Sequence, residues 1–274
     1  LIYHALSNEA IEEVEKLHKI TLTKKLISGY KETIKQKFLR ETICFGRLHY
    51  NSRLENNLTV LTNWKSNHKG LKKWFYKGVE VFGIYLGKSY SRILKFEKKY
   101  QKTLLKSIDN EITFLKFHNP DVVFCTHQRA INAIPIFKAA EVLGIKTVGT
   151  IYSWDNLVKA RLAVRTKTYI VWSNYMRNEL LRYYKEIDAT DVFITGTPQF
   201  ELFEDVEITT KEVFFKTYGL DPSKTTICFS GDDELTSPHD PKYLEDFVTS
   251  IRNNSLEKKV QIIFRRSPVD LSGR

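Results

Sequence analysis

The sequence predicts an α/β protein built on a Rossmann-like parallel sheet, and three observations lead to this fold class. Between residues 121 and 203, short apolar runs alternate with segments of helical spacing, as in consecutive βαβ units. Polar residues gather where the apolar runs end, which is where parallel sheets bind their ligands. The 42% apolar and 13% aromatic content is that of a globular protein, and 274 residues suffice for two domains or one large one.

The expected core contains four strands and two intervening helices. The strands are expected within residues 121–126, 145–154, 168–173 and 191–200, and the helices within 131–144 and 174–187. Gly144 closes the first of these helices. Gly196, Thr197 and Pro198 form the turn that leaves the last strand, where glycine lets a ligand approach the backbone.

The residues before this core predict a basic helical region at about 20–118, preceded by an amphipathic helix over 8–20. Glycines at positions 78, 83 and 87 are expected to interrupt the helical pattern. Residues 58–62 are the one short strand candidate, and a last helix over 111–119 stops at Pro120.

After the core, residues 204–207 form an acidic connector and residues 211–218 a short helix. A new βαβ unit then begins, with strands over 225–230 and 259–266 around a helix over 240–254. Two strands and one helix do not make a stable doubly wound domain. The sequence therefore predicts an N-terminal Rossmann-like domain at 1–203 and the incomplete beginning of a second domain at 204–274. We expect the chain, which starts on Leu1, to be a fragment of a longer protein.

The net charge of +11 belongs entirely to the first part of the chain. Residues 1–100 contain 20 Lys and Arg against 9 Asp and Glu, whereas residues 101–274 contain 23 of each. A localised basic surface indicates one anionic partner. Aromatic residues interleave with lysines around Lys72, Lys73, Trp74 and Lys77, which suits an anionic membrane surface. The alternatives are a solvated helical face with core aromatics, or nucleic acid, which is disfavoured because no known binding module is recognisable.

Cys44, Cys125 and Cys228 are far apart and show no metal-ligand spacing. Cys125 and Cys228 fall within apolar strand runs and are expected to be buried free thiols, which suits a reducing compartment. No apolar run approaches the ~18–20 residues that a membrane span requires. We expect a cytoplasmic protein, peripheral at the inner face of the plasma membrane if the basic region binds lipid, with no metal and no bound cofactor.

Ser153, Trp154, Asp155 and Asn156 follow a buried strand, so their side chains emerge at its carboxyl end. A carboxylate there can act as a general base on an acceptor hydroxyl. Alternatively, Asp155 or Asn156 caps the following turn. Trp154 either stacks on a sugar or covers the sheet, and core packing is the favoured use.

His127 directly follows the first strand and is a second catalytic candidate, with a helix-start histidine as the alternative. Lys159, Arg161 and Arg165 crowd the loop after the second strand. Arginine presents a planar fork of donors, so this loop is interpreted either as a contact for phosphate or carboxylate, or as a solvated basic loop.

In the second unit, Gly231 ends the first strand at the position of a phosphate loop, although the two acids that follow it argue against direct phosphate contact. Ser237 and His239 precede a helix and either bind phosphate with its N-terminal amides or belong to an N-cap cluster with Asp240. Arg265 and Arg266 end the next strand, where contact with a diphosphate is expected.

The order of these elements resembles the GT-B architecture of two Rossmann-like domains. Within it, the chain is similar to bacterial surface-polysaccharide transferases near the CDP-glycerol glycerophosphotransferases and the UDP-N-acetylglucosamine 2-epimerases. The motifs that carry the resemblance are SWDN with LVKARLAVRTKTYIVWS, then VFITGTPQFELF, FSGDDELTSPHDP and IIFRRSP, within residues 119–270. The chain departs from the family's Arg-Pro-His-Pro element, because Arg266 stands in place of proline and Ser267 in place of histidine.

The resemblance implies transfer from a nucleotide sugar or CDP-glycerol to a surface-polysaccharide or lipid-linked acceptor. Asp155 or His127 would be the base, and the acceptor side would hold the cleft residues Ser153, Trp154, Asn156, Lys159, Arg161, Gly196, Thr197 and Pro198. The donor phosphates would meet Arg265, Arg266, Ser267, Ser237, His239 and Gly231. Two alternatives stay open: a UDP-N-acetylglucosamine 2-epimerase, and a non-catalytic protein whose basic region binds anionic lipid or nucleic acid.

Overall fold

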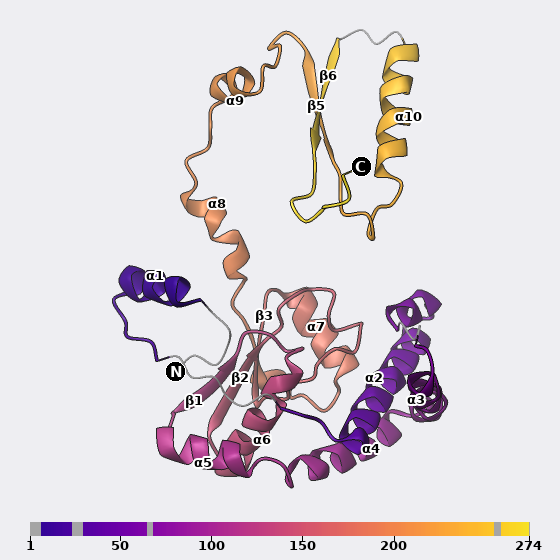
Figure 1. Cartoon of the computed structure of the whole chain (residues 1–274), viewed down its shortest axis with the longest axis vertical. Helices are drawn as coiled ribbons and strands as arrows, with labels where there is room; N and C mark the ends of the chain where they lie inside the picture. Colours follow the sequence, from indigo (N-terminus) through magenta and orange to yellow (C-terminus); the bar gives the residue numbers. More distant parts are fainter. Residues whose placement is uncertain (1–6, 24–29, 65–67, 255–258, 274) are drawn as a thin grey trace. The chain divides into compact units, whose positions relative to one another are not determined.

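The computed structural model describes residues 7–23, 30–64, 68–254 and 259–273 (Figure 1). The chain divides into two compact units, Leu1–Gln199 and Phe200–Arg274. The sequence interpretation placed this division slightly later, between residues 203 and 204.

The first unit contains a four-stranded parallel sheet in the order β1-β2-β3-β4. Its strands are β1 (Val122–Cys125), β2 (Lys146–Thr150), β3 (Thr168–Val171) and β4 (Val192–Ile194). In the register, Cys125 lies beside Gly149, Gly149 beside Tyr169, and Tyr169 beside Val192. The predicted α/β class with a parallel sheet is thus confirmed, and all four expected strands are present.

Helices cover one face of this sheet. α5 (Asp109–His118) and α6 (Ile134–Leu143) share a hydrophobic cluster with Cys125, and α7 (Asn174–Tyr183) packs against Tyr169 and Val171. Gly144 ends α6 with φ 71°, a conformation that glycine adopts without steric cost. On the other face, the Phe124 and Phe193 residues are 53% and 54% exposed. Each strand of this sheet lies next to the strand that precedes it in the chain, and right-handed connections between such strands all run over the same face. This explains why helices cover one face of the sheet and leave the other exposed.

Three helices form a layer before the sheet: α2 (Ile34–Leu54), α3 (Leu71–Gly87) and α4 (Tyr90–Leu104). α3 packs against α2 and α4. The expected interruptions at the glycines are wrong for two of the three, because α3 runs without a break through Gly78 and Gly83 and ends at Gly87. Residues 58–62 are not a strand, since Leu58–Asn63 is a 3-10 helix (η1) that the Asn57 side chain caps at Thr59 N, 2.9 Å away.

The close contact of α2 with α3 explains the glycines. A Cβ at Gly83 would lie 3.2 Å from Gly46 N and 2.6 Å from Phe45 Cδ1, and a Cβ at Gly87 would lie 2.8 Å from Gly46 O. Glycines at these positions therefore let two helix backbones touch, as small residues do in tightly packed helix pairs. α1 (Asn8–His18), capped by Ser7, agrees with the first expected helix.

The helical layer is joined to the sheet through apolar residues. Leu39, Leu86 and Ile93 share a buried cluster with Ile134 of α6. Leu48 and Val60 share another with Ala160, which lies in the segment between β2 and β3. That segment, residues 151–167, contains turns and no helix. The helical layer therefore holds in place the loop that carries the predicted SWDN residues.

The second unit contains a short helix α8 (Leu202–Asp205), α9 (Lys211–Thr217), β5 (Thr225–Ser230), α10 (Asp240–Asn253) and β6 (Val260–Arg265). β5 and β6 pair in parallel, which confirms the predicted βαβ unit. The prediction that Cys228 is buried is wrong, since this residue is exposed. Phe229 contacts Phe247 of α10, with ring centroids 6.4 Å apart, and alternation along the strand turns Cys228 to the opposite face.

Candidate functional site

The loops that follow β1 and β2 are tied together by Gln128. Its side-chain Oε1 accepts a hydrogen bond from Tyr152 N at 2.8 Å, and its backbone carbonyl accepts from Ala163 N at 2.9 Å and Val164 N at 3.0 Å. Gln128 is buried, whereas its neighbours His127 and Arg129 are exposed. One buried side chain therefore sets the position of two loops at the carboxyl ends of adjacent strands.

Two aromatic residues project from the second of these loops. Tyr152 is 52% exposed and Trp154 is 68% exposed, while Ile151 and Leu157 on either side are buried. The favoured interpretation of Trp154 as a core residue is therefore wrong. The loop is anchored by its aliphatic residues, and this leaves the aromatic rings at the surface, where a ring face is open to an apolar ligand surface.

Asp155 is held by two neighbours in the same loop. Ser153 Oγ donates to Asp155 Oδ1 at 2.7 Å, and Lys159 Nζ forms an ion pair with Asp155 Oδ2. Partial burial acts to raise the pKa of this carboxyl, but the hydrogen bonds from Lys159 and Ser153 outweigh it, so the pKa of Asp155 is lowered. A carboxylate with a lowered pKa and engaged oxygens is a weak proton acceptor. The hydrogen bond from Ser153 and the ion pair with Lys159 are both side-chain contacts within the same loop, and the capping alternative stays a prediction.

His127 and Arg129 reach the same loop from the end of β1. The His127 ring lies 5.1 Å from the Tyr152 ring between centroids, and Arg129 Nη1 donates to Asn156 Oδ1 at 3.3 Å. The Asn156 and Gln128 residues are each 2% exposed, and their amide nitrogens have no hydrogen-bond partner among the described residues. The structure thus brings His127 together with the SWDN loop, which is the arrangement that the sequence predicted.

The other predicted residues of the first unit are less closely connected to this loop. Gly196 follows β4 with φ 77°, and Thr197 Oγ1 accepts a hydrogen bond from Gln199 N at 3.4 Å. Pro198 begins the short 3-10 helix η4 (Pro198–Phe200). These residues lie at the same carboxyl edge as Asp155, but the described contacts do not join them to it. The backbone of Arg161 donates to Asn156 O at 3.4 Å.

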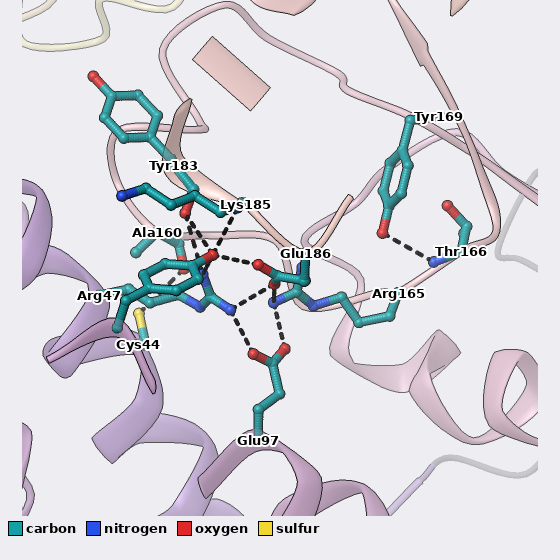
Figure 2. Close-up of polar contacts among 11 residues, drawn as sticks. Cys44, Arg47, Glu97, Ala160, Arg165, Thr166, Tyr169, Tyr183, Lys185 and Glu186 are labelled. Atoms are coloured by element: carbon teal, nitrogen blue, oxygen red, sulfur yellow. Dashed lines mark hydrogen bonds and ion pairs between the residues drawn. The ribbon is translucent and has the colours of Figure 1, made fainter. Parts of the chain in front are cut away.

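Arg165 does not belong to a solvated or phosphate-binding loop. Its Nη2 forms an ion pair with Glu97 of α4 and lies 3.2 Å from Glu186 Oε1 (Figure 2). Arg47 of α2, which is 3% exposed, meets the same two carboxylates at 2.5 and 2.7 Å. Two arginines and two glutamates therefore form a neutral charge cluster at the junction of the helical layer and the sheet.

Aromatic side chains complete this charge cluster. The guanidinium carbons of Arg47 and Arg165 lie 4.5 and 4.7 Å from the centroid of the Tyr184 ring, within the range of cation–π attraction. The Tyr90 hydroxyl donates to Glu186 and accepts from Arg47 Nη1 at 3.1 Å. Burial acts to raise the pKa of Glu97, but Arg165 and Arg47 outweigh it, so the pKa of Glu97 is lowered. Because every charge is neutralised, we interpret this cluster as structural.

In the second unit, the turn after β5 is filled by a carboxylate. Asp240 Oδ2 accepts from Asp232 N at 2.7 Å, and a Cβ on Gly231 would lie 2.8 Å from Phe264 Cε2. Asp240 is the first residue of α10 and His239 its N-cap, without a side-chain cap bond from His239. Asp240 is therefore not the N-cap residue of α10, as the alternative interpretation had it. Its carboxylate instead accepts a hydrogen bond from the backbone of the turn after β5. A phosphate at Gly231 would have to displace this carboxylate.

The remaining candidates of the second unit lie around the end of β6. Arg265 Nη1 donates to Ser230 Oγ at 3.3 Å, and Arg266 Nε lies 3.6 Å from Asp270 Oδ2. The backbone carbonyl of Ser267 accepts from Asp270 N at 3.1 Å. Ser237 O accepts from Asp240 N at 3.3 Å. Arg265 and Gly231 are thus at the same end of the two paired strands, while Arg266 is engaged with a nearby acid.

Sequence reasoning missed the most connected residues of the first unit. Gln128 and Arg129 are not among the candidates that the sequence singles out, and Tyr152 falls within the expected strand over 145–154. A glutamine within a few residues of the end of an apolar strand run is a usable signal, because a buried amide must find partners across the sheet edge. The partners themselves lie on a distant loop, so the sequence alone does not name them.

Comparisons with protein-family models, with curated proteins and with solved structures find no significant match for this chain. Among the described residues, no group of three or more His, Cys, Asp and Glu side chains is placed to hold a metal ion.

Proposed function

We propose that this chain acts as a transferase, which moves a glycosyl or glycerophosphoryl group from a nucleotide-activated donor to a polysaccharide or lipid-linked hydroxyl. The observation that carries the proposal is the group at the carboxyl ends of β1 and β2. There the exposed side chain of His127 lies next to the loop after β2, which carries the exposed rings of Tyr152 and Trp154 and the fixed carboxylate of Asp155. Ligands of parallel α/β sheets bind at this edge, and aromatic rings beside polar groups suit a sugar or polyol.

The contacts favour His127 over Asp155 as the proton acceptor. Asp155 is paired with Lys159 and has a lowered pKa, whereas an imidazole accepts a proton near neutral pH. In the proposed reaction, His127 takes the proton of the acceptor hydroxyl as its oxygen attacks the donor. The nucleotide leaves with the electrons of the broken bond. Within the second unit, Arg265 is proposed as a contact for a nucleotide phosphate. Asp155 and Trp154 then position the acceptor.

The proposal is tested by calorimetric titration of the chain with CDP-glycerol, UDP-N-acetylglucosamine and UDP-glucose. One of these donors is expected to bind saturably. Arg265→Gln is expected to weaken its binding about ten- to a hundredfold, since a hydrogen bond to a charged group contributes about 1.5–3 kcal/mol. Arg266→Gln serves as the matched control. It removes the same charge from the neighbouring residue, whose guanidinium is engaged with Asp270.

A turnover assay that measures nucleotide release separates binding from chemistry. His127→Gln is expected to lower turnover at least a hundredfold, the usual contribution of a general base, while donor affinity stays unchanged. Asp155→Asn is expected to have the smaller effect on turnover. Absence of saturable binding for all three donors would contradict the proposal. Conversion of UDP-N-acetylglucosamine without an acceptor would replace it with the epimerase alternative.

A further inference from the structure

The outer side of α3 carries an exposed apolar stripe. Its members are three, seven, one and three residues apart, and at 3.6 residues per turn this spacing places them along one side of the helix. They are Leu71, Trp74, Val81, Phe82 and Tyr85. Leu71 is 89% exposed and Trp74 is 75% exposed. The opposite side of α3 packs against α2 (Figure 1), where Val79 and Leu86 are fully buried.

Positive charge borders this stripe. Lys73, Lys77 and Lys88 follow the apolar residues along one margin of the helix, and all three are exposed. The one acidic residue of α3, Glu80, is largely covered, accepts a hydrogen bond from Trp64 Nε1 at 3.2 Å and lies 3.9 Å from Lys77 Nζ. We name the five apolar residues and these three lysines the α3 outer face.

We infer that the α3 outer face binds the surface of a membrane rich in anionic lipid. A helix whose exposed aromatic and aliphatic stripe is bordered by lysines lies in the interface plane, with rings among the headgroups and ammonium groups on lipid phosphates. The whole net charge of +11 lies in residues 1–100, and this positive charge favours an anionic lipid surface over another protein helix as the occupant of the α3 outer face. The described helices include none that is both long and apolar enough to cross a bilayer, so the inferred contact is superficial. This inference is independent of the proposed function.

Vesicle flotation tests the inference with the whole chain. Vesicles of phosphatidylcholine with 30% phosphatidylglycerol are compared with vesicles of pure phosphatidylcholine, at two salt concentrations. Binding is expected only with the anionic vesicles and is expected to weaken at high salt. The triple variant Lys73→Gln, Lys77→Gln, Lys88→Gln is expected to lose affinity by on the order of a hundredfold, since each lysine near such a surface contributes roughly fivefold.

A matched control removes three exposed lysines elsewhere, with Lys146→Gln, Lys216→Gln and Lys242→Gln, and is expected to keep most of the affinity. Trp74→Ala is expected to weaken binding about tenfold or more and to leave the circular dichroism spectrum unchanged, because this side chain is exposed. Equal binding to both vesicle types, or equal losses in the two triple variants, would overturn the inference. So would binding to an oligonucleotide but not to vesicles, or a dimer in sedimentation velocity that Trp74→Ala dissociates.

Discussion

Replacing Gly83 with alanine tests the close contact between α2 and α3. In an exposed helix this change stabilises by about 1 kcal/mol, because alanine is the better helix former. Here the added Cβ would lie 2.6 Å from Phe45 Cδ1, 3.1 Å from Phe45 Cβ and 3.2 Å from Gly46 N. Real Cβ atoms essentially never approach another atom to 2.6 Å, and neither a buried ring nor a helix backbone yields easily. Overpacking of about 2–3 kcal/mol therefore exceeds the helix gain.

The expected net loss of unfolding free energy for Gly83→Ala is about 1–2 kcal/mol. Gly78→Ala is the matched control on the same helix, since its Cβ would lie 3.5 Å from Phe38 Cε2 in ordinary van der Waals contact. That variant is expected to gain up to about 1 kcal/mol. Urea unfolding followed by circular dichroism measures the unfolding free energy of both variants. The dependence of that free energy on urea concentration should be the same in both. Equal stability of the two alanine variants would refute the reasoning.

The remaining predictions concern the charge cluster and the SWDN loop. Arg47→Met is expected to lower the unfolding free energy by about 3 kcal/mol, because it leaves two carboxylates with one arginine, and a loss under 1 kcal/mol would contradict this. The pKa of Glu97 is lowered in the folded state, so the contribution of its ion pairs to the unfolding free energy is complete above the unfolded pKa of about 4.3 and is lost as pH falls. The loss of unfolding free energy that Glu97→Gln causes, measured by urea unfolding, should therefore become smaller below about pH 4. A loss that does not change with pH would exclude the assigned ion pairs. Lys159→Met should raise the pKa of Asp155 in carbon-13 NMR titration, whereas Arg161→Met, the control in the same loop, should not. Tyr184→Phe should leave the unfolding free energy from thermal melts unchanged or higher, since it keeps the ring and removes a buried hydroxyl without a described partner. Tyr184→Leu removes the ring that faces the guanidinium groups and should lower the unfolding free energy by about 1 kcal/mol.

Much of the fold follows from local pattern. The apolar runs before Thr126 and Ile151 and the helical spacing before Gly144 placed strands and helix within a few residues of their observed bounds. The same reasoning failed at residues 58–62, where Asn57 caps a 3-10 helix. Short runs are ambiguous because a strand of a few residues and a single helical turn contain similar side chains.

The candidate site was predictable only in outline. The alternation of strands and helices put His127 and Asp155 at one sheet edge, and the structure brings their loops together through Gln128. The exposure of Trp154 was not predictable, because it depends on which residues of an irregular loop are anchored by the helical layer. A loop without period has no pattern from which burial can be inferred.

By itself the sequence determined the α/β class, the succession of strands and helices along the chain and the division near residue 200, because these depend on periodicities that span only a few neighbouring residues. It also determined that the excess positive charge lies in the first hundred residues. The tertiary structure alone decided that Arg165 pairs with Glu97, and that Gly83 lies in a helix contact and not at a helix break. These partners are far apart in the chain, and only the packing of α2, α3 and α4 on the sheet brings them within reach of one another.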